Sequence, residues 1–93
     1  MIVSFADRDA ERLCQRQRVK RLDPRLHRKA LIKLWLLDAV HELDELRVPP
    51  GNRLEALKGA RIGQHSIRIN DQWRICFVWT SAGPSEVEIV DYQ

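Results

Sequence analysis

Hydrophobic and polar residues alternate one by one in the segment between Gln64 and Trp79. A period of two is typical of a β-strand that buries one face. The pattern predicts strands at Gln64–Ile69 and Trp73–Trp79. Their linker, Asn70-Asp71-Gln72, contains residue types that accept left-handed backbone and bond to their own main chain, so it predicts a hairpin turn. We expect the apolar face to enter a core and the other face to present the polar set Ser66, Arg68 and Arg74.

Helical spacing of apolar residues appears in two earlier segments. Asp7 suits the N-cap of a short helix with an apolar stripe of Ala10, Leu13 and Cys14. Asp23 and Pro24 suit the start of a second helix, which we expect to run to about Leu46. Its apolar face is broad enough to require burial against a sheet: Leu26, Ala30, Leu34, Leu36, Leu37, Val40 and Leu43. Trp35 is predicted near the margin of this face, packed in the core.

The remaining segments complete a small α+β domain. Met1–Phe5 is short and apolar and predicts a first strand, and Glu86–Gln93 alternates as a last strand. Val48–Asn52 holds two prolines and ends the helical region, and Thr80–Ser85 predicts a turn. The predicted order is β-α-α-β-β-β, with residues 1–93 as a single domain and two helices packed on a mainly antiparallel sheet.

Composition limits the classes of protein that the chain can belong to. No apolar run approaches ~18 residues and no signal segment is seen at the N-terminus, so we expect a cytoplasmic protein without a membrane partner. The two cysteines, Cys14 and Cys76, lie beside apolar residues and are interpreted as reduced, buried thiols. The net charge is +3, and ten of the sixteen lysines and arginines fall between Arg8 and Lys33. Such a basic half suits RNA or an acidic protein segment, although solvated helices often carry similar charge.

Several motifs resemble the RelE/ParE superfamily of bacterial toxins, most closely its HigB-type branch, which includes the GraT toxins. They are Asn52–Gly59, the run GQHSIRINDQWRICF and the ending Val87–Tyr92. The resemblance extends over nearly the whole chain. It implies a curved sheet with the N-terminal strand paired inside it. It also implies a type II toxin that cleaves mRNA on the ribosome. The implied partners are a HigA-type helix-turn-helix antitoxin and the ribosome with mRNA in the A site.

The implied reaction is attack of an RNA 2′-hydroxyl on the adjacent phosphate. This chemistry requires a base, an acid and positive charge near the phosphorane, and it requires neither a metal nor a cofactor. Arginine offers a bidentate, permanently charged group for a phosphate. The residues interpreted as phosphate or RNA ligands are Arg53, Lys58, Arg61, Arg68 and Arg74. Without the family match, ordinary surface side chains are the simpler interpretation of these positions; the match favours Lys58 and Arg74 most.

The chain ends Asp91-Tyr92-Gln93, where the family pattern is Asp-Tyr-His. The histidine is the proposed proton shuttle of the family, and an amide cannot take that role near pH 7. Glu55 could replace it as base and Tyr92 as acid. The predicted catalytic set is therefore Glu55, Lys58, Arg74, Asp91, Tyr92 and Gln93. His65 is expected on the face of Ile67, away from Arg68.

Gln93 leaves three explanations open: a natural variant that relies on Glu55, Asp91 and Tyr92, a naturally attenuated toxin, or an engineered change. Two other functions also compete with the nuclease. One is a gyrase poison of the ParE type on the same fold, against which Lys58, Arg74 and the Asp91-Tyr92 pair argue. The other is a non-catalytic protein that binds the ribosome or the antitoxin, which Gln93 favours. The basic segment Arg16–Arg21 is either a solvated turn or a contact surface for phosphate or antitoxin.

Overall fold

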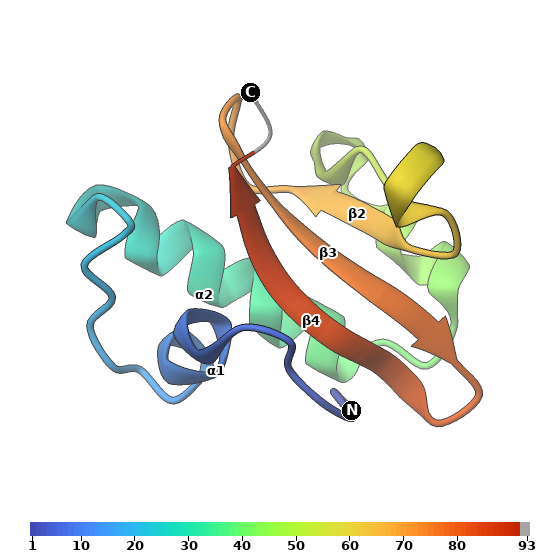
Figure 1. Cartoon of the computed structure of the whole chain (residues 1–93), viewed down its shortest axis with the longest axis horizontal. Helices are drawn as coiled ribbons and strands as arrows, with labels where there is room; N and C mark the ends of the chain where they lie inside the picture. The colour runs from blue at the N-terminus through green and yellow to red at the C-terminus, as the bar shows by residue number, and fades with distance from the viewer. Residues whose placement is uncertain (92–93) are drawn as a thin grey trace.

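The computed structural model describes residues 1–91 and consists of helices packed on a four-stranded sheet (Figure 1). The strands are β1 (Glu55–Ala56), β2 (His65–Arg68), β3 (Trp73–Thr80) and β4 (Gly83–Asp91), all antiparallel in the order β1-β2-β3-β4. The helices α1 (Arg8–Cys14) and α2 (Pro24–Ala39) contact each other and β4. The predicted α+β class, with helices preceding an antiparallel sheet, is confirmed.

The predicted hairpin is present as β2 and β3. Ile67 pairs with Ile75 and Arg68 pairs with Arg74. In the turn, the Asn70 side-chain oxygen accepts hydrogen bonds from the backbone N–H groups of Gln72 (2.9 Å) and Trp73 (2.7 Å). This local bonding explains why an Asn-containing linker reverses the chain here.

The core lies between the helices and one face of the sheet. It combines Ala10 and Leu13 of α1 with Ala30, Leu34 and Leu37 of α2, and its sheet residues are Ile67, Ile69, Trp73, Ile75, Phe77, Val87 and Ile89. Phe77 is fully buried. Trp35 was predicted to pack in the core, and this prediction is wrong. Its surface is 41% exposed, because it lies on the solvent side of α2. Within residues 1–91, no helix is long and apolar enough to cross a membrane.

The second helix ends earlier than predicted. Both helices have the expected caps, with Asp7 accepting from the backbone N–H of Asp9 and Asp23 from that of Arg25. However, α2 stops at Ala39, and Val40 takes an extended backbone. The Glu45 carboxylate accepts from the backbone N–H groups of His41 (2.7 Å) and Glu42 (2.5 Å), and these bonds lower its pKa. They cap a separate 3₁₀ helix, η1 (Leu43–Arg47), which still buries Leu46.

The strand boundaries also differ from the prediction. Met1–Phe5 forms no regular strand; only Phe5 makes a β-bridge, parallel to Val87. Further backbone bonds hold the segment beside β4, including Val3 N–H to the Pro84 carbonyl at 2.7 Å. β4 begins at Gly83, inside the predicted turn. Gly83 has φ 128°, and a Cβ atom there would collide with the Met1 carbonyl, so close packing of the N-terminal segment requires glycine. The short β1 was not predicted.

Candidate functional site

Arg74 is the centre of a polar site on the face of the sheet opposite the core. Only 7% of this residue is exposed. Its Nε donates to the Ser66 hydroxyl at 2.8 Å, and its Nη2 donates to the Arg53 carbonyl at 2.7 Å. A buried guanidinium group needs such acceptors, and they fix its orientation. The site therefore contains a charged group that is held in place before any ligand arrives.

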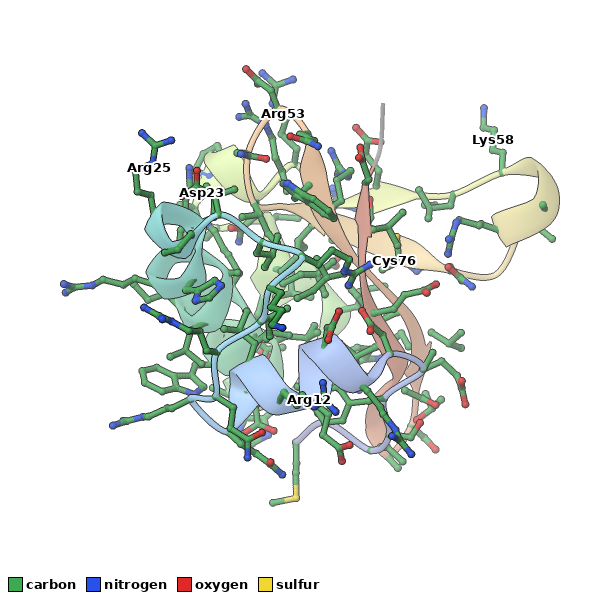
Figure 2. All side chains as sticks on the ribbon, turned by 60° about the vertical axis from the view of Figure 1, so that its left-hand side comes forward. Arg12, Asp23, Arg25, Arg53, Lys58 and Cys76 are labelled. Carbon is green, nitrogen blue, oxygen red and sulfur yellow. The ribbon has the colours of Figure 1, made fainter. Side chains whose placement is uncertain are left out.

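The carbonyl of Arg53 reaches Arg74 because the backbone of Arg53 is left-handed, with φ 46° and ψ 57°. Arg53 follows the 3₁₀ helix η2 (Pro50–Asn52). Asn52 is fully buried and anchors this segment: its amide nitrogen donates to the carbonyls of Leu46 (3.1 Å) and Val48 (3.3 Å), and its oxygen accepts from Lys33. Figure 2 shows the Arg53 side chain extending outward at the top of the molecule.

A cavity of about 220 Å³ lies between this segment and the hairpin turn. It is lined by Arg53, Arg68, Asn70, Asp71 and Arg74. Three of the five residues predicted to bind phosphate thus meet in one hollow. Arg68 forms an ion pair with Asp71, whose side chain is 95% exposed. Such an exposed carboxylate holds its partner weakly, so an incoming anion can replace it.

Glu55 lies beside this cationic group. β1 pairs with β2 so that Glu55 is opposite Ser66, and Glu55 Oε2 lies 4.0 Å from Arg74 Nη2. The Glu55 side chain is 52% exposed, whereas that of Arg74 is 9% exposed. The structure therefore places a solvent-accessible carboxylate next to a fixed arginine, which is an arrangement that can accept a proton from a bound hydroxyl group.

Lys58 and Arg61 do not line this cavity. Lys58 precedes the 3₁₀ helix η3 (Gly59–Arg61) and extends into solvent, separated from Arg53 (Figure 2). Arg61 donates to Glu88 at 2.6 Å and to Gln64 at 3.0 Å. Both cysteines are free thiols; Cys76 is buried as predicted, whereas Cys14 is only partly buried. Burial raises the pKa of Cys76, so its thiol stays protonated.

The C-terminal residues are only partly described. Asp91 pairs with Trp73, and its carboxylate accepts from the Gln72 amide at 3.1 Å. Strand alternation places Asp91 on the Trp73 side of the sheet, whereas Arg74 is on the other. Tyr92 and Gln93 lie outside the described residues. Their predicted roles stay predictions.

His65 faces the core side, as predicted. It pairs with Phe77, and the two rings stack with centroids 6.3 Å apart. It therefore lies on the opposite face from Arg74. Among residues 1–91, no group of three or more histidine, cysteine, aspartate or glutamate side chains is arranged to hold a metal ion.

Ser66 is a site residue that was predicted on the polar face of the hairpin, but without a role in the site. We expect Ser66→Ala to slow the mRNA cleavage that the family resemblance implies by about tenfold to 10²-fold, because a misplaced guanidinium group no longer fits the transition state. The substitution also removes one hydrogen bond to a buried charged group, which costs about 1–3 kcal/mol of folding free energy. Single-turnover cleavage and thermal unfolding measure the two effects.

Ser66→Thr is the informative companion because it restores a hydroxyl group. It should recover most of the cleavage rate. Ser85→Ala is the matched control, since that hydroxyl pairs with Ser4 at the other end of β4, at 3.1 Å. Equal losses for the alanine variants at Ser66 and Ser85 would contradict the positioning role.

The fold is that of a RelE-like toxin. A family model described as "RelE-like toxin of type II toxin-antitoxin system HigB" matches residues 3–93, so the chain belongs to the HigB-like toxin family. The protein named Toxin HigB-1 of Vibrio cholerae serotype O1 (strain ATCC 39315 / El Tor Inaba N16961) is 41% identical over 80 residues, which cover 85% of this chain and 84% of that protein. The predicted resemblance is confirmed. A toxin of such a system has an antitoxin as its partner.

Proposed function

We propose that this toxin is a ribosome-dependent mRNA endonuclease. The observation that carries the proposal is the meeting of Arg53, Arg68 and Arg74 around one cavity, with Glu55 beside Arg74. Three guanidinium groups in a small hollow favour a multiply charged anion such as the phosphorane of RNA cleavage.

The proposed reaction uses residues of this chain. The 2′-oxygen attacks the adjacent phosphorus atom and loses its proton, and the bond from phosphorus to the 5′-oxygen breaks. The products are a 2′,3′-cyclic phosphate and a 5′-hydroxyl group, which takes up one proton. Arg74 stabilises the charge that grows on the phosphate oxygens, because its fixed orientation requires no reorganisation during the reaction. Glu55 is the proposed base.

The other predicted residues also keep roles in the proposal. Lys58 and Arg61 contact RNA or ribosome outside the cavity, since neither lines it. Asp91, Tyr92 and Gln93 keep their predicted catalytic roles, with Tyr92 as the proposed acid. Asp91 lies on the Trp73 side of the sheet, and Tyr92 and Gln93 lie outside the described residues. The proposed partners are a HigA-type helix-turn-helix antitoxin and a translating ribosome with mRNA in the A site. We further propose that residues 1–93 form one domain that acts in the cytoplasm, without metal or cofactor.

The test is a reconstituted translation reaction with a defined mRNA, sampled with and without the toxin. Cleavage within the translated region, only when ribosomes translate, is the expected result. A 2′-deoxy substitution at the cleaved position should abolish it. Uncut mRNA together with trapped gyrase–DNA complexes would instead favour the ParE-type activity.

A catalytically inactive binding protein is the second candidate, and Gln93 is the feature that favours it. Such a protein would bind ribosomes or antitoxin through the same basic surfaces. Ribosome binding that weakens with salt, without cleavage by the natural sequence or by a Gln93→His variant, would support this candidate.

A further inference from the structure

We infer that a groove on the outer side of the helices binds an acidic, amphipathic segment of the antitoxin. The groove has a volume of about 540 Å³ and lies between α2 and the segment that follows α1. This inference rests on membership of the toxin family and does not depend on the proposed nuclease activity.

The groove exists because α2 carries a second apolar stripe. Leu31, Ile32 and Trp35 follow Arg28 at spacings of three, four and seven residues, which places all four on one side of the helix. The core uses a different stripe, formed by Ala30, Leu34 and Leu37. Ile32 is 49% exposed and Trp35 is 41% exposed. Clustered exposed apolar side chains with a polar rim are typical of a protein interaction site.

The opposite wall of the groove is held in a defined position. Arg16 lies just after α1 and has a left-handed backbone (φ 64°), and its guanidinium carbon lies 4.9 Å from the centroid of the Trp35 ring. His27 Nε2 donates to the carbonyls of Val19 (2.9 Å) and Leu22 (3.2 Å), which ties the connecting segment to α2. A groove whose walls are already fixed loses little conformational freedom on binding.

The charge around the groove selects an acidic partner. Arg16, Arg18 and Arg28 line it, and none of its lining residues is acidic. Within residues 1–91, neither Arg18 nor Arg28 takes part in an ion pair. Carboxylates of a partner can therefore pair with these arginines without breaking an existing ion pair.

The floor of the groove favours protein over RNA. Leu31 and Ile32 are aliphatic and offer burial to apolar side chains, whereas a phosphate backbone gains nothing from them. One face of the Trp35 ring is already occupied by Arg16, which limits stacking of a nucleotide base. A segment with an apolar anchor and flanking carboxylates satisfies both the floor and the rim.

The test uses the full-length toxin and its purified cognate antitoxin in a calorimetric titration. Ile32→Glu and Arg28→Glu should each weaken binding by about tenfold or more, as expected for a central interface residue. Val48→Glu is the control, because Val48 is an exposed aliphatic residue (70%) outside the groove. Circular dichroism should show that all three variants fold like the natural protein.

Hydrogen–deuterium exchange gives a second readout without substitution. Antitoxin binding should slow exchange in residues 16–35. Natural affinity of both groove variants, or unchanged exchange there, would overturn the inference. A third outcome would also overturn the inference. If Arg28→Glu binds the antitoxin as well as the natural protein does but binds a short single-stranded RNA more weakly, the groove is an RNA surface. These readouts do not measure mRNA cleavage. Failure of the proposed nuclease function is therefore distinguishable from failure of this inference.

Discussion

Replacement of Arg74 by alanine is expected to slow mRNA cleavage on translating ribosomes by about 10²–10³-fold, the effect of removing one fixed donor from a developing oxyanion. Arg74 is the residue of the cavity whose orientation is best defined, by Ser66 and by the Arg53 carbonyl. The measurement is single-turnover cleavage of a defined mRNA bound in a stalled ribosome complex. Binding of the variant to the ribosome should change much less than the cleavage rate.

Arg74→Lys separates charge from geometry. Lysine keeps the positive charge but cannot reach Ser66 and Arg53 with one planar fork, so cleavage should recover only in part. Arg25→Ala is the matched control, because Arg25 has an 89% exposed side chain at the start of α2 and pairs only with Asp23 among the described residues. Natural cleavage by Arg74→Ala would contradict the proposed site. Thermal unfolding of each variant excludes a loss of fold as the cause.

Local signals predicted the parts of the fold that depend on neighbouring residues. The period of two in β3 and the Asn70 turn defined the hairpin, and Asp7 and Asp23 marked both helix starts correctly. The predicted end of α2 was wrong because no proline or glycine marks the observed end. Glu45, which lies outside this helix, caps the turn that follows. Trp35 was misplaced because hydrophobicity alone does not distinguish a core stripe from a second, exposed stripe.

The candidate site could be predicted as a set of residue types but not as an arrangement. Arg68 and Arg74 were expected on one face, and register confirms that they are paired. Their meeting with Arg53 depends on a left-handed residue and on buried Asn52, neither of which has a signal in a single sequence. Lys58 was grouped with them chiefly by the family match, and Arg61 was placed in the same phosphate-binding set. Neither lines the cavity, because Lys58 precedes η3 and Arg61 ends it.

The replacement of Gln93 by histidine is expected to raise mRNA cleavage by roughly 10²–10⁴-fold, the usual contribution of a general acid or base. An amide can hydrogen-bond to a phosphate but cannot exchange a proton near neutral pH, whereas imidazole does so with an ordinary pKa of about 6.5. The natural protein and the Gln93→His variant should be compared in the same translation reaction, with Gln93→Asn as a control that retains an amide.

The pH dependence of the gained activity tests the mechanism behind it. If the introduced imidazole acts as base, its neutral form is required, and cleavage should rise as the pH passes upward through about 6.5; if it acts as acid, cleavage should fall over the same interval. A gain without this dependence would indicate a positioning effect. Equal cleavage by all three proteins would place the proton transfers on residues such as Glu55 and Tyr92. That result would make Gln93 a tolerated natural variant, because Glu55 already lies 4.0 Å from the arginine that holds the phosphate in the proposed mechanism.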